Sequence, residues 1–279
     1  MTGARAEAGT LYVVATPIGN LDDLSPRARA VLAKTDVIAA EDTRHTRGLL
    51  LSISAESRLI AYHEHNEEQR VPELLTRLAA GESVALVSDA GTPLISDPGW
   101  RLVRAAQDAG IAVVPVPGAC AAIAALSAVG LPTDRFVFEG FLPRRDGPRD
   151  ERLGEIKHEP RTLIFYEAVH RIAATLAAIA TAFGGERRAA LAREITKIHE
   201  QIVVGTLAEL HVRLDGEIPL LGEFVIVVAG DTSEISADLA EAQRVYALLV
   251  AEVEPGTALK LTAAITGLAR NDLYRLLRT

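Results

Sequence analysis

Cysteine, tryptophan and methionine each occur only once among the 279 residues, and aromatic residues make up 4% of the chain. The single cysteine, Cys120, has no partner for an internal disulfide, which is typical of proteins in a reducing compartment such as the cytoplasm. Because hydrophobic residues still make up 49% of the sequence, the core must be aliphatic and rich in alanine. Such a core is common in layered α/β proteins.

Long uninterrupted apolar segments are also missing. Residues 1–9 contain no apolar run of the length that a secretion signal needs, and we expect them to form a flexible tail. The longest uncharged stretch, residues 111–131, is interrupted by Pro115, Pro117 and Gly118, so it predicts a short strand, a turn and a helix rather than a membrane span. The sequence therefore predicts a cytoplasmic protein with no membrane segment.

An excess of positive charge is absent as well. The formal net charge is −8, which argues against a protein that coats nucleic acid non-specifically but is compatible with a local basic patch. The densest cationic cluster contains four arginines, diluted by three acidic residues: Arg144, Arg145, Arg149 and Arg152. We interpret this segment either as a solvated loop or as a contact for RNA.

Several well-defined catalytic motifs do not occur. The sequence has no G-x-G-x-x-G after its first strand and no phosphate-binding P-loop, which argues against dinucleotide and phosphoryl chemistry. The serine motif G-x-S-x-G is missing too. His63 and His65 lie close to Glu64 and Glu67, but without a metal-binding spacing. We therefore favour an exposed polar loop there and predict no metal.

Short apolar segments alternate with helical patterns through the first half of the chain. The expected strands are residues 11–15, 37–40, 59–62, 84–87 and 112–116. Ser25 followed by Pro26 predicts the start of a helix between the first two. This alternation predicts a mostly parallel sheet covered by helices, with ligands at the carboxyl ends of its strands.

The second half predicts a mixed α/β domain, because few helices separate its later strands. The expected strands are residues 136–141, 162–166, 189–192, 202–204 and 224–229. The predicted fold class is thus α/β, with two sheets flanked by helices and a small C-terminal helical extension. We predict an N-terminal domain over residues 10–132, a C-terminal domain over 133–231, a polar linker over 230–236 and the extension over 237–279.

Loops rich in glycine, alanine and proline follow three strands of the first half. They read TPIGN (16–20), SDAGTP (88–93) and PGACAA (117–122). Such residues allow unusual backbone angles and let a ligand approach the main chain closely. Because the carboxyl ends of parallel strands share one edge of a sheet, we expect these loops to line a small-molecule site together.

Longer motifs resemble a known family. They are VATPIGNLDDLSPRA (14–28), AAEDTRHTR (39–47), YHEHNE (62–67), SDAGTPLISDPG (88–99), GLPTDRFVFEGFLPR (130–144), LIFYEAVHR (163–171), LAREITKIHEQIVVGTL (191–207) and GEFVIVV (222–228). In this order they closely resemble the ribosomal RNA small subunit methyltransferase I family of the tetrapyrrole methylase superfamily. The resemblance covers about residues 10–279.

The resemblance implies a homodimer of two-domain subunits with S-adenosylmethionine in the cleft between the domains. It implies 2'-O-methylation of the ribose of a cytidine in the decoding region of 16S ribosomal RNA, within the small ribosomal subunit. The residues that it implies for cofactor binding are Pro17, Gly19, Asn20, Ser88, Asp89, Ala90, Gly91, Thr92, Pro93, Ile95, Gly118, Cys120, Ala121, Tyr166, Glu167, Glu194 and Ile195. At Cys120 many relatives carry other small residues, so a hydroxyl contact is lost there.

The residues that would activate the ribose hydroxyl, the acceptor of the methyl group, can be interpreted in two ways. A ribose hydroxyl needs a base for its proton or a cation for its alkoxide, and two charged segments, EDTRHTR (41–47) and REITKIHE (193–200), offer such groups. We predict Lys197, Asp42, Arg44 and Glu200 as catalytic residues. Lys197 is favoured as the base if its pKa is depressed, although nearby carboxylates would act against this. The alternative is that these charges form surface ion pairs.

The charge of the donor adds one further expectation. A sulfonium loses its positive charge as the methyl group leaves, so a dense set of carboxylates would stabilise the ground state more than the transition state. We therefore expect main-chain carbonyls, rather than many carboxylates, around the donor.

The helical extension carries Lys260, Arg270, Arg275 and Arg278 around Gly267. It is interpreted as an RNA contact, a dimer contact or a packing element. Two other functions stay open: methylation of a tetrapyrrole, which would need a large trough edged by aromatic residues, and a non-catalytic ribosome-docking module that binds the cofactor without transferring its methyl group.

Overall fold

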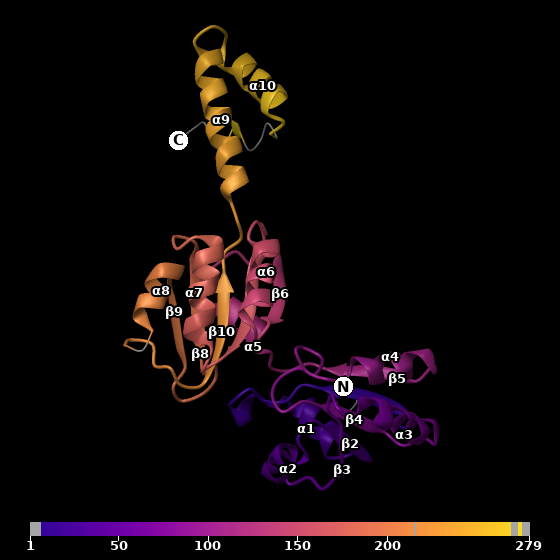
Figure 1. The fold of residues 1–279 in the computed structure, drawn as a ribbon. Coiled ribbons are helices and arrows are strands. Elements are labelled where there is room, and N and C mark those ends of the chain that lie inside the picture. The colour runs from indigo at the N-terminus through magenta and orange to yellow at the C-terminus, as the bar shows by residue number, and fades with distance from the viewer. Residues whose placement is uncertain (1–6, 215, 269–272, 275–279) are drawn as a thin grey trace. The chain divides into compact units, whose positions relative to one another are not determined.

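The computed structural model describes residues 7–214, 216–268 and 273–274, with the backbone alone for residues 233–240. The chain forms two compact units: Met1–Ile156 with Thr162–Ala229, and Lys157–Arg161 with Gly230–Thr279. The first unit contains two β-sheets with their helices, and the second contains helices α9 (Ser233–Val250) and α10 (Pro255–Thr266) (Figure 1).

The N-terminal sheet is parallel throughout. Its strands are β1 (Thr10–Val14), β2 (Val37–Ala40), β3 (Arg58–Ala61), β4 (Val84–Val87) and β5 (Ala112–Val116), in the order β3-β2-β4-β1-β5. The central strands β2 and β4 are buried along their whole length, as their continuous apolar sequences predict. The prediction of a parallel sheet is confirmed, and the carboxyl ends of β1, β4 and β2 lie side by side.

Helices cover both faces of this sheet. Helices α1 (Pro26–Leu32) and α2 (Thr43–Ser52) pack on one face, and α3 (Glu67–Ala79) and α4 (Trp100–Asp108) pack on the other. A short 3₁₀ turn, η1 (Leu21–Asp23), precedes α1. The predicted helix start is confirmed, because the Ser25 hydroxyl accepts a hydrogen bond from the Ala28 N–H at 3.1 Å and Pro26 occupies the first helical position.

The second sheet is mixed. Its strands are β6 (Phe136–Phe141), β7 (Thr162–Ala168), β8 (Arg188–Arg193), β9 (Gln201–Thr206) and β10 (Glu223–Val228), in the order β6-β7-β10-β8-β9. Strands β6 and β7 are parallel, whereas β10 runs antiparallel to both of its neighbours and β9 runs antiparallel to β8. The predicted mixed α/β character of this half is confirmed.

Helix α5 (Ala121–Ala128) follows the last strand of the first sheet but packs on the second. Its Ala122, Ala125 and Leu126 share a buried cluster with residues of β7, β8 and β10. Helices α6 (Asp146–Ile156), α7 (Ile172–Phe183) and α8 (Leu207–Arg213) cover the opposite face. The domain boundary at residue 132 stays a prediction. Helix α5 precedes this boundary in the chain but packs on the sheet formed by the residues after it.

Two segments differ from the sequence prediction. The arginine-rich segment is not a loop throughout, because α6 begins at Asp146 and carries Arg149 and Arg152. Pro148 is compatible with this helix because it lies in the first turn, where the main-chain N–H has no intrahelical partner.

The polar linker predicted over residues 230–236 is shorter than expected, because α9 begins at Ser233 after Thr232 in the N-cap position. Serine and threonine favour helix starts, and no glycine or proline interrupts the sequence again before Pro255.

The second unit has a small core of its own. Ala242 of α9, Leu259 of α10 and Leu273 are buried together. Among the residues predicted as cationic contacts of the extension, Lys260 lies on α10, whereas Arg270, Arg275 and Arg278 lie outside the described residues. Within the described ranges, none of the helices combines the length and the apolar character needed to cross a bilayer.

Candidate active site

The three small-residue loops meet at the carboxyl edge of the N-terminal sheet. Thr16, after β1, and Gly91, after β4, exchange two main-chain hydrogen bonds of 2.9 and 3.2 Å. The Thr92 hydroxyl donates to the carbonyl of Ala119, in the loop after β5, at 3.0 Å. The loops therefore lie together, as the parallel order of the strands predicts.

Two glycines allow this close approach. Gly91 has a φ of +83°, and a Cβ atom there would lie 3.2 Å from a methyl carbon of Ile18. A Cβ atom on Gly118 would lie 2.9 Å from the Cβ of Ala15. Larger residues at these positions would push the loops apart, so the glycines are needed for the shape of this edge.

Unusual backbone angles gather in two loops. Leu94 and Ser96 have φ values of 74° and 68°, and Glu194 and Thr196 have φ values of 51° and 69°. Residues other than glycine rarely adopt positive φ, and each such residue costs on the order of 1–3 kcal/mol, which the surrounding structure must supply. Strain of this kind clusters at binding and catalytic sites, and both loops border the same cavity.

A cavity of about 360 Å³ lies between the two sheets of the first unit. This volume is in the range of ordinary small-molecule sites. Many of the residues predicted to hold the cofactor lie on its wall: Asp89, Ala90, Gly91, Thr92, Ile95, Cys120, Ala121, Tyr166, Glu167 and Ile195. The structure thus brings residues of both halves of the chain around one space.

The other predicted cofactor residues are not on the cavity wall: Pro17, Gly19, Asn20, Ser88, Pro93, Gly118 and Glu194. Several of them shape the loops instead. The Asn20 side chain caps η1 by accepting a hydrogen bond from the Asp22 N–H at 3.1 Å. Gly118 packs against Ala15, as described above. A direct contact between these residues and a cofactor stays a prediction.

The wall also contains residues that the sequence did not indicate as cofactor contacts: Ile18, Glu41, Ser96, Asp97, Phe141, Ala168, Ala192, Glu223, Phe224 and Val225. Three of these begin β10. Because β10 is antiparallel to β7 and β8, Glu223 pairs with Ala168, and Phe224 pairs with Arg193 at the end of β8. The motif GEFVIVV (222–228) could have indicated these residues. Their position at the cavity, however, depends on the direction of β10 in the sheet, which the sequence alone does not reveal.

Three carboxyl groups lie together where β2 and β4 end. Asp89 Oδ1 accepts a hydrogen bond from the Asp42 N–H at 2.9 Å, and the Asp89 N–H donates to Glu41 Oε2 at 3.4 Å. Burial raises the pKa of Glu41, and the nearby charge of Asp89 adds to this. Burial also raises the pKa of Asp97 to about 6, helped by Glu41 and Asp89 and opposed by a hydrogen bond from Ser88.

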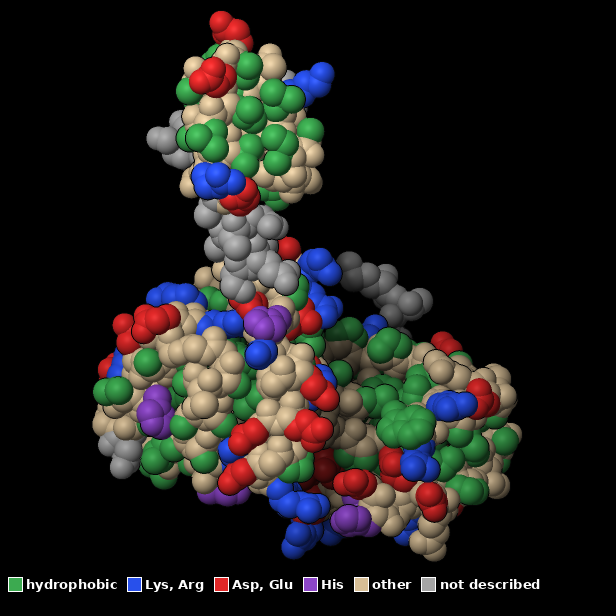
Figure 2. Space-filling model, turned by 45° about the horizontal axis from the view of Figure 1, so that its top comes forward, with side chains coloured by type: hydrophobic (Ala, Val, Ile, Leu, Met, Phe, Trp, Pro, Cys, Tyr) green, Lys and Arg blue, Asp and Glu red, His purple; other side chains and the backbone are tan. Residues whose placement is uncertain are grey.

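The expectation of few carboxylates at this site is therefore wrong, since Glu41, Asp89, Asp97 and Glu223 all lie on the cavity wall. Acidic side chains are also visible around the hollow of the first unit in Figure 2. The physical reason is that partial burial raises the pKa of Glu41 and of Asp97. A raised pKa means that burial makes the charged form of each group less favourable than it is in water.

Lys197 is held by two carboxylates. Its ammonium lies 2.8 Å from Glu194 Oε1 and 2.9 Å from Glu223 Oε2. Burial lowers the pKa of Lys197, but these two contacts outweigh it and leave the pKa above its ordinary value. The depressed pKa that a base would need is not present, so the structure favours Lys197 as a cation.

The other predicted catalytic residues have structural partners. Asp42 caps α2 by accepting a hydrogen bond from the Arg44 N–H at 2.7 Å, and its carboxylate pairs with the Arg44 guanidinium at 2.8 Å. This pairing lowers the pKa of Asp42, and the Arg44 side chain is 90% exposed. Glu200 accepts a hydrogen bond from the Thr196 N–H at 2.7 Å and so holds the strained loop. None of the three is on the described cavity wall.

Glu67, considered above beside the two histidines, also has a structural place. It is buried, and its Oε1 accepts hydrogen bonds from the Tyr62 hydroxyl and from the Gly99 N–H, both at 2.9 Å. It therefore fixes the turn that leads from the cavity loop into α4.

Tyr166 joins the loop after β5 to the second sheet. Its hydroxyl accepts a hydrogen bond from the Ala122 N–H at 3.0 Å, and the thiol of Cys120 lies 4.0 Å from it. Its ring makes edge contacts with Phe138 and Phe141, with centroids 5.0 and 5.7 Å apart. Burial raises the pKa of Tyr166, so this hydroxyl stays neutral.

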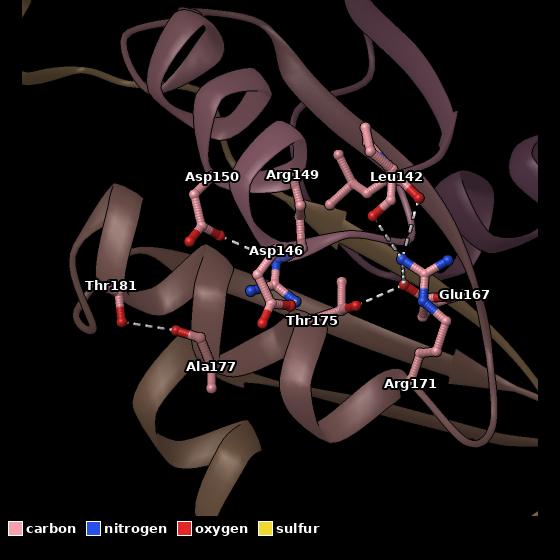
Figure 3. A network of polar contacts seen from close by, with 10 residues as sticks. Leu142, Asp146, Arg149, Asp150, Glu167, Arg171, Thr175, Ala177 and Thr181 are labelled. Carbon is pink, nitrogen blue, oxygen red and sulfur yellow. Dashed lines mark hydrogen bonds and ion pairs between the residues drawn. The ribbon is translucent and has the colours of Figure 1, made fainter.

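Glu167 is directed into the protein rather than into the cavity. Its side chain is fully buried, and its carboxylate accepts hydrogen bonds from the Thr175 hydroxyl at 2.6 Å and from the Ala168 N–H at 2.8 Å. The Arg171 guanidinium lies 3.4 Å from it (Figure 3). Glu167 lies on the cavity wall, and its contact with a cofactor stays a prediction; its carboxylate is occupied by these protein partners.

The fold and the cavity define the class of protein. The family model described as Tetrapyrrole (Corrin/Porphyrin) Methylases matches residues 10–211, and the model described as RsmI C-terminal HTH domain matches residues 236–278. A solved structure, uroporphyrin-III C-methyl transferase from Thermus thermophilus complexed with S-adenyl homocysteine, has a TM-score of 0.54 at 19% identity. The match covers 81% of this chain and 99% of the chain in that structure. The fold is that of the tetrapyrrole methylases.

Relatives of higher identity are more specific. Ribosomal RNA small subunit methyltransferase I of Xylella fastidiosa (strain Temecula1) is 56% identical over 267 residues, covering 95% of this chain and 98% of that protein. The protein of the same name from Pseudomonas aeruginosa is 56% identical over 272 residues, covering 96% of each. The chain belongs to the ribosomal RNA small subunit methyltransferase I family.

Proposed function

We propose that this protein transfers a methyl group from S-adenosylmethionine to the ribose 2'-hydroxyl of a cytidine in the decoding region of 16S ribosomal RNA. The observation that carries the proposal is the cavity of about 360 Å³ walled by both sheets, in a chain that is 56% identical to methyltransferases named for this RNA. The substrate is the small ribosomal subunit, and the reaction takes place in the cytoplasm.

The cavity wall is chemically suited to S-adenosylmethionine. Apolar groups such as Ile18, Ile95 and Phe224 can cover an adenine ring, and Asp89 can accept a hydrogen bond from an amino group or a ribose hydroxyl. When bound, the cofactor supplies an electrophilic methyl group. The hydrogen bonds between Thr16 and Gly91 and between Thr92 and Ala119 keep the loops in place, so the site is shaped before the donor enters.

Glu41 is the group best placed to take the proton of the acceptor hydroxyl. It lies on the cavity wall, the Asp89 N–H orients its carboxylate, and burial raises its pKa. A carboxylate with a raised pKa is a stronger base than an exposed one. Glu41 would take the hydroxyl proton as the ribose oxygen receives the methyl group, and the sulfonium of the bound donor would become a neutral thioether.

The predicted catalytic residues have supporting roles in this proposal. Lys197 offsets the charges of Glu194 and Glu223 beside the cavity. Asp42 positions Asp89 through its main-chain N–H, and Glu200 fixes the loop that carries Lys197. The exposed Arg44 is available for a phosphate of the RNA. The protein acts as a homodimer, with the N-terminal domain (10–132), the C-terminal domain (133–231) and the helical extension (237–279) in each subunit.

The test is methylation of small ribosomal subunits that lack the modification. Purified protein is incubated with S-adenosylmethionine tritiated in the methyl group, and the labelled nucleotide is mapped by nuclease digestion and mass spectrometry. We expect the label on the ribose of one cytidine in the decoding region. Label on a nucleobase, on a porphyrinoid offered in parallel, or on no acceptor although the donor binds would overturn the proposal.

A pair of glycine variants links this activity to the cavity. Gly91 and Gly81 both have positive φ values, of +83° and +92°, but only Gly91 lies on the cavity wall; a Cβ atom on Gly81 would meet nothing within 4 Å. Both Gly91→Ala and Gly81→Ala therefore introduce similar backbone strain. We expect Gly91→Ala alone to weaken binding of the donor in calorimetry.

A further inference from the structure

Strand β6 contains an irregularity just before its end. The pairing of β6 with β7 shifts register between Phe138 and Gly140, and Gly140 has a φ of +65°. A Cβ atom on Gly140 would lie 3.0 Å from the Ser96 hydroxyl oxygen, on the loop that borders the cavity. Phe141 follows directly and lies on the cavity wall. Residues 141–145, here called the 141–145 segment, continue the chain from this point.

An ion pair between a partly buried arginine and a buried glutamate holds this segment. The Arg171 guanidinium donates to the carbonyls of Leu142 and Pro143 at 3.0 and 3.1 Å. Its own partner is the fully buried carboxylate of Glu167, at 3.4 Å, which Thr175 also contacts (Figure 3). Because a partly buried cation fixes two main-chain carbonyls of the segment, the segment has one defined conformation before any partner binds.

The segment exposes an aromatic ring at the cavity. Phe141 is 54% exposed, although it lies on the cavity wall and contacts Tyr166 edge-on. Single exposed apolar side chains are common on protein surfaces, but among the exposed large apolar residues of the described ranges only Ile95 and Phe141 also line the cavity. Aromatic rings that proteins present beside cationic groups are typical platforms for unstacked nucleobases.

Two unpaired cations follow the ring. Arg144 and Arg145 are exposed, and no ion pair is found for either among the described residues. The next arginines in the chain differ. Arg149 pairs with Asp146 at 3.0 Å and Asp150 at 3.1 Å, and Arg152 pairs with Glu139 at 2.9 Å. Of the cluster noticed in the sequence, Arg144 and Arg145 are therefore the members whose charge is free for a ligand.

We propose that the 141–145 segment binds single-stranded RNA at the cavity rim, with Phe141 stacked on a nucleobase and Arg144 and Arg145 on the phosphates beside it. This inference rests on the proposed function, because it assigns a contact surface to the RNA that the cavity modifies. RNA fits better than a protein partner, since an exposed ring followed along the chain by two unpaired arginines matches bases and phosphates in alternation. The net charge of −8 makes a local cationic segment necessary for any RNA contact.

The first test measures equilibrium binding to unmethylated small subunits at several salt concentrations. We expect Arg144→Ala with Arg145→Ala to weaken binding by about tenfold or more and to reduce the slope of log affinity against log salt by roughly 1.4, as for two single-strand phosphates. The affinity for S-adenosylmethionine should not change. Binding that keeps its strength and its salt slope would overturn the proposal.

A matched control has the same change in net charge. The variant Arg104→Ala with Arg213→Ala also removes two arginines, but these are already paired with Asp108 at 3.8 Å and Glu217 at 2.5 Å. We expect its affinity for the subunit and its salt slope to stay close to those of the unsubstituted protein. An equal loss in both double variants would show that overall charge, and not the segment, determines binding.

The ring is tested separately. Phe141→Tyr keeps an aromatic face, whereas Phe141→Leu keeps the apolar character and loses stacking. We expect only Phe141→Leu to weaken binding, by about 5- to 100-fold, the usual range for the loss of one stacked base. Equal binding by both variants would contradict stacking. If Phe141→Leu instead converts a dimer to a monomer in light scattering, the ring belongs to a subunit interface and the proposal is wrong.

These outcomes are distinct from failure of the proposed function. If labelled methyl groups reach the cytidine ribose while all segment variants bind the subunit normally, the activity stands and the RNA surface lies elsewhere. If the unsubstituted protein binds subunits through this segment but labels only another acceptor, the surface assignment stands and the reaction assignment fails.

Discussion

The side chain of Lys197 lies directly against Gly19, so that a Cβ atom at residue 19 would overlap the Lys197 Cγ. Gly19 has a φ of +153°, a conformation that other residues rarely adopt. The contact joins the loop after β1 to the loop between β8 and β9, and thus the two halves that wall the cavity. Because this contact leaves no room for a side chain at residue 19, a substitution of Gly19 should disturb both loops.

Gly19→Ala should lower both stability and activity. The strained φ costs on the order of 1–3 kcal/mol, and the added methyl group displaces Lys197 from Glu194 and Glu223. We expect a lower urea midpoint and a higher Michaelis constant for the donor. Gly48→Ala is the control: Gly48 lies inside α2 with nothing within 4 Å of a Cβ atom, so this change should stabilise the protein by about 0.5–1 kcal/mol. Normal donor kinetics in Gly19→Ala would argue against the contact.

The second prediction separates the roles of Glu41 and Lys197. Glu41→Gln removes the proposed base and should lower kcat by about 10²- to 10⁴-fold, the usual contribution of general base catalysis. Lys197→Arg keeps a cation that cannot lose its proton at ordinary pH, so kcat should stay within about threefold. Single-turnover methylation of small subunits measures both. An inactive Lys197→Arg variant beside an active Glu41→Gln variant would restore Lys197 as the base.

The pH dependence of the unsubstituted enzyme follows from the same assignment. A base must be deprotonated to act, and burial raises the pKa of Glu41 above its ordinary value. The rate should therefore fall as the pH is lowered through that raised pKa, and this acidic limb should be absent from the residual rate of Glu41→Gln. A rate that rises only above the ordinary range of a lysine pKa would point to Lys197 instead.

The sequence predicted the strands and the convergence of the loops well, because both depend on local pattern. Continuous apolar runs mark β2 and β4, and a parallel order then brings Thr16 next to Gly91. It did not reveal Glu223 and Phe224 as cavity residues, because their position depends on the antiparallel direction of β10. Direction within a mixed sheet is set by tertiary packing.

Side-chain partners were the other limit of prediction. Glu167 and Lys197 each occur in motifs that the resemblance connects with the active site, but what each one does depends on its neighbours. Thr175 and Arg171 hold the Glu167 carboxylate inside the protein, and Glu194 and Glu223 raise the pKa of Lys197. These partners lie from 3 to 26 residues away along the chain, so the sequence alone does not show which of them meet.

The third prediction concerns Tyr166, whose hydroxyl accepts the Ala122 N–H at the start of α5. Tyr166→Phe leaves that N–H without its acceptor, which should cost about 1 kcal/mol of stability and loosen the loop that carries Cys120. We expect donor affinity to fall by severalfold in calorimetry. Tyr12→Phe removes a hydroxyl that accepts the Glu7 N–H away from the cavity and should leave donor affinity unchanged. Equal donor affinity in the two variants would contradict the role of Tyr166.

The fourth prediction is a pH dependence of stability caused by Asp97. Burial raises its pKa in the folded protein to about 6 from the ordinary 3.8, so the folded state holds this proton more tightly than the unfolded state does. The resulting stabilisation is complete below about pH 4 and is lost as the pH rises through about 6. Asp97→Asn should therefore match the unsubstituted protein near pH 4 and exceed its free energy of unfolding by about 1–2 kcal/mol near pH 7.5, a value reduced for solvent screening at the open cavity.

Urea unfolding at four or five pH values between 4 and 8 measures this difference, and Asp36 provides a control of opposite sign. Hydrogen bonds from the Ser83 hydroxyl and N–H, at 2.6 and 2.8 Å, lower the pKa of Asp36. Its contribution to stability is therefore present at neutral pH and is lost as the pH falls through the lowered pKa. Asp36→Asn should be destabilised at neutral pH and approach the unsubstituted protein in acid. If Asp97→Asn shows the same difference at every pH, Asp97 does not carry the raised pKa, and the acidic wall of the cavity is more fully charged than its burial indicates.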